Sequence, residues 1–164
     1  MSKAIVYQNP WFEVIKDGHW HYIHEPNAKN GAVVVARKAQ QTLLVSIHRQ
    51  AQDGELIELP RGYGEPGETS AACAARELAE ETGYQLTPTD FELIGHVKPN
   101  TAILSSNIPV FRCELNAAMP RHESDNEVTS IVWTDDDDIP ALIRAGKISC
   151  GITLAALMLH QNSN

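Results

Sequence analysis

The sequence has little cysteine, and its three cysteines are widely spaced. Cys73, Cys113 and Cys150 form neither a Cys-x-x-Cys pair nor a cluster with histidine. A disulfide framework or a zinc site would need such a grouping, so the sequence predicts reduced, buried thiols in a cytoplasmic protein. Long apolar runs are also missing: the stretch MSKAIVYQNPWFEV has no signal-peptide core, and no segment reaches the length of a membrane span. We therefore expect no membrane partner.

A basic stripe is absent as well. The 164 residues include 13 Lys and Arg against 21 Asp and Glu, which gives a formal net charge of −8. Because nucleic acids and anionic membranes are bound through clustered cations, we expect no nucleic-acid partner. An anionic substrate would need local positive charge to neutralise it. The length and the 43% hydrophobic content fit a single domain over residues 1–164 with a sizeable core.

Short strands and few helices are predicted along the chain. Apolar runs bounded by turn residues such as Asn9-Pro10 and Asp17-Gly18 indicate strands. They cover residues 4–8, 11–16, 19–24, 31–37, 42–48, 56–59, 91–97, 108–115 and 128–133, with a polar connector at 25–30. Helices are expected at residues 69–82, 140–146 and 149–161, and the aspartate run 135–138 is expected to cap the second. Strands in series with two or three helices between them indicate an α/β layer protein with a mixed sheet.

The sequence marks both ends of the helix at residues 69–82 and the loop before it. Thr69 or Ser70 can serve as N-cap, and Gly83 stands where a C-terminal glycine belongs. The preceding stretch GYGEPGE is rich in glycine, and its Pro66-Gly67 pair fits the centre of a type II turn. Such a loop can bring a backbone carbonyl next to the helix.

Three glutamates lie on one patch of this helix. Residues three and four apart share a helix face, so Glu77, Glu80 and Glu81 converge, although like charges at this spacing destabilise a helix. Clustered oxygens are the ligands that Mg²⁺ and Mn²⁺ prefer, and a bound cation would relieve the repulsion. We also expect Glu68 to pair with Arg76 across the loop–helix junction, so that Arg76 orients the cluster. The alternative is an ordinary solvated acidic face.

The loop and helix together resemble the Nudix box, G-x5-E-x7-R-E-U-x-E-E-x-G-U, in which U is a large aliphatic residue. The seven fixed positions of that pattern are filled here by Gly62, Glu68, Arg76, Glu77, Glu80, Glu81 and Gly83. With each residue type at roughly one in fifteen, such a match arises by chance on the order of once per million chains of this length. Tyr84 takes the last aliphatic position, a departure that bears on packing rather than on the metal site.

The resemblance implies a Nudix fold, an α/β/α sandwich with a mixed β-sheet, in which residues 62–84 form the loop–helix–loop catalytic box. It implies Mg²⁺ or Mn²⁺ held by Glu77, Glu80 and Glu81 together with the carbonyl of Gly62. Nudix enzymes hydrolyse nucleoside diphosphates linked to another moiety, and metals on a diphosphate neutralise its charge and polarise phosphorus. We therefore expect a small-molecule nucleotide substrate.

A wider stretch resembles the ADP-ribose pyrophosphatase branch of this superfamily. Residues 45–62, VSIHRQAQDGELIELPRG, are similar to the segment before the box in that branch, with matches at Arg49, Glu55, Glu58 and Pro60. The resemblance implies hydrolysis of ADP-ribose to AMP and ribose 5-phosphate. It makes Arg49 and Glu58 candidate substrate-binding residues, and Pro99 a third, since the branch has a proline at that distance from the box. The three residues before Arg49 depart from the pattern, and Arg49 can equally form a surface ion pair.

In that branch an acidic residue on a late loop binds metal or activates water. The segment HESDNEV, residues 122–128, offers Glu127 first, because a strand follows it directly, and then Asp125 and Glu123. The alternative is a solvated acidic loop. The related pyrophosphatases also pair through N-terminal strands, so residues 1–30 are a possible dimerisation element and we expect a homodimer.

Other activities stay open at this point. GDP-mannose, a dinucleotide or a nucleoside triphosphate are alternative substrates within the same superfamily. A Nudix-fold module that binds a nucleotide without cleaving it is a further alternative. The intact glutamates argue against such a module, because modules of that kind commonly lose them.

Overall fold

A seven-stranded mixed sheet forms the centre of the computed structural model, which describes residues 3–116, 119–124 and 128–163. Its strands are β4 (Ala32–Lys38), β5 (Gln41–Arg49), β6 (Gly54–Glu58), β7 (Arg61–Gly62), β8 (Glu92–Val97), β9 (Ile108–Glu114) and β10 (Val128–Asp135). Five of them follow the order β10-β5-β4-β9-β8, while β6 pairs with β5 and β7 with β4. The pair β4–β9 is parallel and the other pairs are antiparallel.

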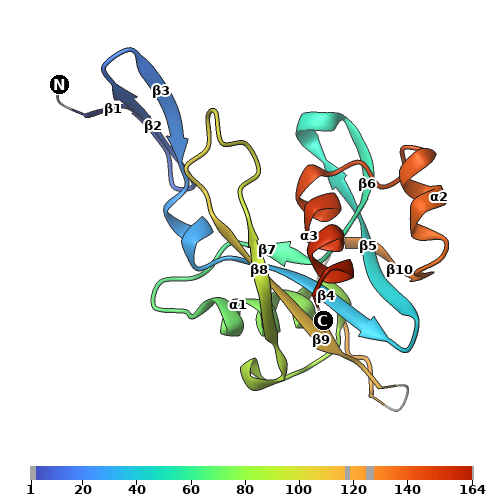
Figure 1. Ribbon diagram of the computed structural model, residues 1–164. Coiled ribbons are helices and arrows are strands. Elements are labelled where there is room, and N and C mark those ends of the chain that lie inside the picture. The colour runs from blue at the N-terminus through green and yellow to red at the C-terminus, as the bar shows by residue number, and fades with distance from the viewer. Residues whose placement is uncertain (1–2, 117–118, 125–127, 164) are drawn as a thin grey trace.

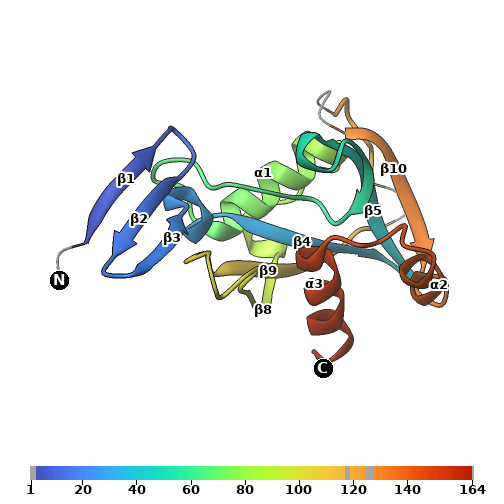
Figure 2. The same ribbon diagram turned by 90° about the horizontal axis from the view of Figure 1, so that it is seen from above.

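Helices cover both faces of this sheet (Figure 1 and Figure 2). They are α1 (Ser70–Thr82), α2 (Ile139–Arg144) and α3 (Gly151–Gln161). Successive strand residues point to opposite faces: in β4, Val34 shares a core cluster with Leu78 of α1, and Val35 shares another with Leu157 of α3. The predicted α/β/α sandwich is therefore confirmed. In the described part of the chain, no helix combines the length and apolarity that crossing a bilayer needs.

The N-terminal residues form a small sheet that projects from the central one (Figure 1). Its antiparallel strands are β1 (Ala4–Gln8), β2 (Glu13–Asp17) and β3 (Trp20–His24). Large apolar side chains are exposed on this sheet and its turn, among them Ile5, Tyr7, Trp11 and Trp20, the last 76% exposed. The N–H of Ile23 donates to the carbonyl of Ile103 at 2.7 Å. This bond joins β3 to the loop before β9.

The strands predicted from sequence are present among the described residues, with small shifts at their ends. β2 begins at Glu13 and not at residue 11, because the side-chain oxygen of Asn9 accepts hydrogen bonds from the N–H groups of Trp11 and Phe12 and holds a turn there. The two-residue strand β7 and three short 3₁₀ helices were not predicted. The 3₁₀ helices are Pro26–Lys29, in the expected connector, Gln50–Gln52 and Pro88–Asp90.

The three cysteines are free thiols. Cys73 and Cys113 are buried, and burial raises the pKa of each thiol to about 12, which favours the unreactive protonated form. Cys150 is only half-buried, at the N-terminus of α3. The predicted burial therefore holds for two of the three.

A buried arginine ties the end of β4 to the segment after β10. Arg37 is 8% exposed; its Nη2 donates to Oδ2 of Asp136 at 2.6 Å, and its Nη1 donates to the hydroxyl of Thr42. The guanidinium holds the pKa of Asp136 below its ordinary value. The expectation that the aspartate run caps the next helix is wrong for its side chains, because Asp138 stands at the N-cap without a capping hydrogen bond. Asp136 instead neutralises a buried cation.

Replacing this carboxylate should destabilise the fold. We expect Asp136→Asn to lower the free energy of unfolding by about 1–2 kcal/mol at neutral pH, since a charge-assisted pair is lost and partial exposure limits its strength. A depressed folded-state pKa contributes stability that is full above the unfolded value, roughly 4, and is lost as the pH falls through the folded value. Urea unfolding of wild type and variant should therefore converge in acid.

Asp137→Asn is the matched control for this measurement, because Asp137 is exposed and adjacent. We expect it to change the free energy of unfolding by less than about 0.5 kcal/mol. Equal effects of the two substitutions, or a difference that persists below pH 3, would contradict the role assigned to the pair.

Candidate active site

Helix α1 carries the acidic patch and is fixed at both ends. The hydroxyl of Thr69 accepts a hydrogen bond from the N–H of Ala72 at 3.2 Å, so Thr69 and not Ser70 is the N-cap. Gly83 closes the helix in a left-handed conformation with φ of 77°. The buried, small side chain of Ala74 lets the helix lie close to the sheet, and α1 packs on β4 and β7. The acidic residues are thereby held beside the glycine-rich loop.

The loop before α1 approaches the helix closely at Gly62. A Cβ atom at that position would lie 2.1 Å from Oε1 of Glu77, so any larger residue would collide with this carboxylate. Further along, Gly67 has a φ of 82°, and the N–H of Glu68 donates to the carbonyl of Glu65 at 3.0 Å. These features confirm the predicted type II turn. The turn aims Glu68 back at the helix.

Arg76 joins the loop to the acidic patch. Its Nε and Nη2 each donate to Glu68 at 3.1 Å, which confirms the predicted ion pair. Its Nη1 donates to Glu77 at 2.7 Å and to Glu80 at 2.8 Å, and Nη2 also reaches the carbonyl of Tyr63 at 2.8 Å. The hydrogen bonds to Glu68, with the charge of Glu77, raise the pKa of the guanidinium. One cation thus orients three carboxylates.

Glu81 is the acidic residue of the patch that this network does not reach. It is 4% exposed, and its buried Oε2 has no hydrogen-bond partner. Burial, reinforced by the charge of Glu77, raises the pKa of Glu81 to about 8. A buried carboxylate oxygen without a partner normally costs stability. It fits a position at which a cation is bound.

The residues present fit a divalent cation, although they do not form a finished metal site. In the described part of the chain, no three acidic, histidine or cysteine side chains are already grouped as metal ligands, because Arg76 turns Glu77 and Glu80 toward itself. Glu81 offers the unpartnered oxygen, and Gly62, whose carbonyl is the other candidate ligand, ends β7 next to Glu77. Such oxygen-rich donors are those that Mg²⁺ and Mn²⁺ take.

A buried carboxylate next to this patch holds two arginines. Glu58 is 1% exposed, and its Oε2 lies 2.7 Å from Nη2 of Arg49 and 2.9 Å from Nη2 of Arg61. Burial alone would raise the pKa of Glu58, but the two guanidinium groups outweigh it and hold the pKa below its ordinary value. The charges of both arginines also act on Glu81. The guanidinium groups of both arginines therefore lie beside the acidic patch.

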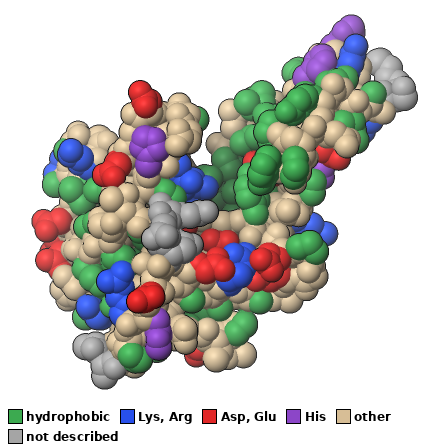
Figure 3. All heavy atoms as spheres, turned by 180° about the vertical axis from the view of Figure 1, so that it is seen from behind, with side chains coloured by type: hydrophobic (Ala, Val, Ile, Leu, Met, Phe, Trp, Pro, Cys, Tyr) green, Lys and Arg blue, Asp and Glu red, His purple; other side chains and the backbone are tan. Residues whose placement is uncertain are grey.

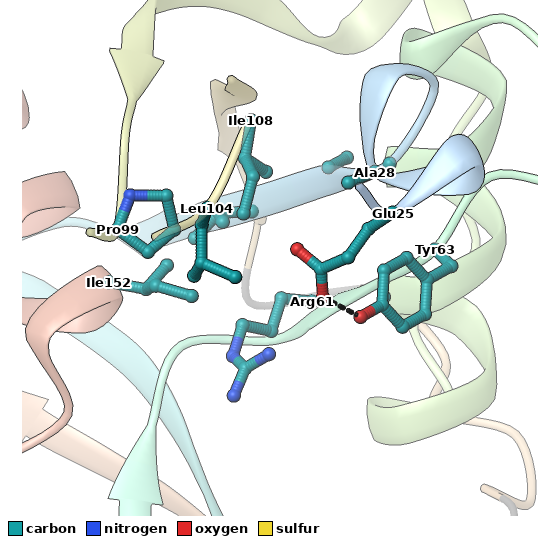
Figure 4. A pocket seen from close by; sticks show the side chains of 12 residues that line it. Glu25, Ala28, Arg61, Tyr63, Pro99, Leu104, Ile108 and Ile152 are labelled. Carbon is teal, nitrogen blue, oxygen red and sulfur yellow. Dashed lines mark hydrogen bonds between the residues drawn. The ribbon is translucent and has the colours of Figure 1, made fainter. Parts of the chain in front are cut away.

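A pocket of about 120 Å³ adjoins this site at Gly62 (Figure 4). Its apolar lining includes Pro99, Leu104, Ile108 and Ile152, and its polar side chains are Glu25, Arg61 and Tyr63. The hydroxyl groups of Tyr63 and Ser106 both donate to the carboxylate of Glu25. Seen from behind, acidic and basic side chains gather below a hollow whose wall is largely hydrophobic (Figure 3). The molecule thus combines a charged centre with an apolar recess.

The residues of the acidic patch and the arginines beside it lie within the match to a known family model. The model of the NUDIX domain matches residues 27–149. The chain belongs to the NUDIX family. Residues 62–84, its Nudix box, hold both the close approach at Gly62 and the Arg76 network.

Two relatives and one solved structure show how far the likeness extends. NAD-capped RNA hydrolase NudC from Vibrio vulnificus is 28% identical over 80% of this chain and 48% of its own length. CMP-5'-(N-acetyl-N-hydroxy-3-aminopropyl)phosphonate hydrolase from Streptomyces rubellomurinus is 26% identical over 84% of this chain and 65% of its own. The chain thus spans about half to two thirds of these relatives.

The solved structure is a crystal structure of ADP compounds hydrolase. It aligns with a TM-score of 0.76 over 98% of this chain and 90% of that chain, at 14% identity. At this identity the likeness shows a shared fold and nothing more. Fold alone does not determine substrate.

The structure brings most of the predicted site residues together. The members of the Nudix box among them, Gly62, Arg76, Glu77, Glu80 and Glu81, share one loop–helix junction. Arg49 and Glu58 adjoin that junction, and Pro99 lines the neighbouring pocket. Glu127 and Asp125 lie outside the described residues, whereas Glu123 is described and exposed.

Sequence reasoning missed several residues at the site. Arg61 had a weak signal, a charged residue between Pro60 and the first box glycine, directly after a strand. Glu25 had none, because its partner Ser106 is 81 residues away in the chain. Tyr63 was overlooked because it stands between Gly62 and Gly64, in a segment interpreted only as a glycine-rich loop. Each of them acquires its place only through tertiary contacts.

The unpartnered oxygen of Glu81 predicts a conflict between stability and function. In EDTA at pH 7.5, we expect Glu81→Gln to raise the free energy of unfolding by about 1–2 kcal/mol. With its pKa raised to about 8, Glu81 must on folding take up a proton or stay charged beside Glu77, whereas a neutral amide does neither. Addition of Mg²⁺ should raise the midpoint of thermal unfolding of the wild type more than that of the variant. Glu80→Gln, at an exposed position of the same helix, should leave the free energy in EDTA within about 0.5 kcal/mol. A destabilised Glu81→Gln protein would contradict this account.

Proposed function

We propose that this protein is a metal-dependent Nudix hydrolase that cleaves the diphosphate linkage of a nucleoside diphosphate joined to another moiety. On the sequence resemblance, ADP-ribose, cleaved to AMP and ribose 5-phosphate, is the first substrate to test. The observation that carries the proposal is the buried, unpartnered carboxylate oxygen of Glu81, which lies close to Glu77 and to two arginines. The carboxylate oxygen can bind a cation, and the two arginines can bind an anionic substrate.

The glutamates and Arg76 have different roles in the proposed site. Glu77, Glu80 and Glu81, with the Gly62 carbonyl, would hold Mg²⁺ or Mn²⁺, which when bound supplies the charge that polarises the phosphoanhydride. Arg76 keeps the loop and the helix in register through its bonds to Glu68. Glu77 and Glu80 face Arg76 in this structure, so holding the cation would require their carboxylates to turn away from the guanidinium.

Arg49 and Arg61 suit the phosphate groups. Their side chains are 30% and 26% exposed, and each is anchored on Glu58. Anchored guanidinium groups bind phosphate oxygens with directional, charge-assisted hydrogen bonds. Glu58 itself is almost fully buried with its oxygens on the arginines. We therefore propose that it supports substrate binding through them.

Hydrolysis of ADP-ribose tests the proposed function. With Mg²⁺ the wild type should release AMP, and EDTA should abolish this release. Glu81→Gln should lower kcat/KM by at least about a hundredfold, as expected when charge stabilisation in the transition state is lost. Glu114→Gln, at the exposed last residue of β9, should leave the rate unchanged.

Two results would contradict the proposal. One is the absence of AMP with every divalent metal although the protein is folded. The other is an undiminished rate in Glu81→Gln. Tight nucleotide binding without turnover or metal dependence would favour a non-catalytic binding module. A GDP-linked sugar is the second candidate substrate, because the pocket beside the box presents the carboxylate of Glu25 to its ligand.

We also propose that two copies pair through the N-terminal sheet. The sheet projects from the body (Figure 2). Apolar residues exposed on the sheet and its turn include Val6, Trp11 and Trp20. Exposed apolar clusters of this kind mark interaction surfaces. Light scattering after size exclusion should give twice the monomer mass of 18.1 kDa. Trp20→Ser should return it to the monomer mass, whereas Met158→Ser, at an exposed position on α3, should not; a monomeric wild type would contradict the pairing.

A further inference from the structure

The pocket at Gly62 has the lining that a nucleobase needs. Apolar side chains form most of its wall, among them Leu104, Ile108 and Ile152, and its few polar groups converge from other elements (Figure 4). Ligand sites commonly combine apolar walls with a few placed polar groups. At about 120 Å³ the pocket is smaller than the roughly 300–1,000 Å³ of sites for whole drug-sized ligands. It therefore suits one ring system of a nucleotide.

The carboxylate of Glu25 is held in a fixed orientation at this pocket. The Tyr63 hydroxyl donates to its Oε1 and the Ser106 hydroxyl to its Oε2. Burial, together with Glu25, raises the pKa of Tyr63 to about 12, so the phenol stays protonated and remains a donor. A carboxylate oxygen can accept two hydrogen bonds, so each oxygen keeps capacity for a ligand. The pocket thus offers two adjacent acceptors.

Two adjacent acceptors suit one base better than the others. Guanine carries an N–H and an amino group side by side on its pairing edge. Adenine and cytosine place a ring nitrogen acceptor beside their amino group, and uracil flanks its single N–H with carbonyls. An acceptor facing an acceptor is repulsive, so the carboxylate disfavours these three. We propose that this pocket binds the base of the substrate and that Glu25 selects guanine.

The proposal rests on the proposed hydrolase function and gives its substrate class, a guanosine diphosphate derivative. Arg61 connects the two parts of the site, because it lines the pocket and is also paired with Glu58 at 2.9 Å. Its charge acts on Glu81 as well. A base seated in the pocket would therefore keep its diphosphate beside the arginines and the glutamates of α1.

Substrates that differ only in their base test the selection. We expect kcat/KM with Mg²⁺ to fall in the order GDP-ribose, IDP-ribose, ADP-ribose, because hypoxanthine keeps the ring N–H of guanine but lacks its amino group. The ratio of GDP-ribose to ADP-ribose should be about ten- to a hundredfold, the usual range for a paired base contact. Glu25→Gln should shift this ratio toward ADP-ribose by a similar factor, because an amide can both donate to and accept from adenine.

Matched measurements separate this inference from the proposed hydrolysis. Glu114→Gln should keep the wild-type ratio, as it makes the same change outside the pocket. An equal loss for all three bases in Glu25→Gln would overturn the selection and indicate a contact to ribose or a structural role. If no substrate is cleaved, calorimetry with GMP and AMP still decides: tighter binding of GMP by wild type but not by Glu25→Gln supports the pocket, and equal or absent binding overturns it.

Discussion

The site depends on how one guanidinium, that of Arg76, bonds three of the four nearby carboxylates and leaves out the fourth. Arg76 contacts Glu68, Glu77 and Glu80 and also donates to the carbonyl of Tyr63, and these bonds close the loop onto helix α1. Glu81 is left out, buried and with an oxygen unpartnered. The fold therefore tolerates an unfavourable electrostatic arrangement at Glu81. Proteins keep such unfavourable positions where function requires them, at a cost in stability.

Local charge, rather than total charge, determines what this surface can bind. The chain is acidic overall, with a net charge of −8, which by itself argues against anionic ligands. Around the glutamates, however, Arg49, Arg61 and Arg76 are all fixed by carboxylates that are partly or fully buried. Glu58 is decisive here, because without it two arginines would lack an anchor. A diphosphate would meet pre-oriented cations within an acidic protein.

The sequence was sufficient to predict contacts between residues that are close in the chain. The turn centred on Pro66-Gly67 and the pairing of Glu68 with Arg76 span eight residues or fewer, and local rules predicted them. The same rules narrowed the N-cap to Thr69 or Ser70, and the structure shows Thr69. The pair of Arg37 and Asp136 spans 99 residues, so the aspartates were assigned to a helix cap instead. Contacts of this length depend on how strands register across the sheet. No local pattern encodes that register.

The position of Glu25 links the projecting N-terminal sheet to the pocket. Glu25 directly follows β3, and the Nδ1 atom of its neighbour His24 lies 3.0 Å from the hydroxyl of Ser105. The N–H of Ser105 in turn donates to the carbonyl of Ile23 at 3.0 Å. Any partner that shifts β3 would therefore shift the carboxylate as well as the loop that holds it. Pairing of two copies and recognition of the base would then be coupled through the same few hydrogen bonds, since both act on one segment.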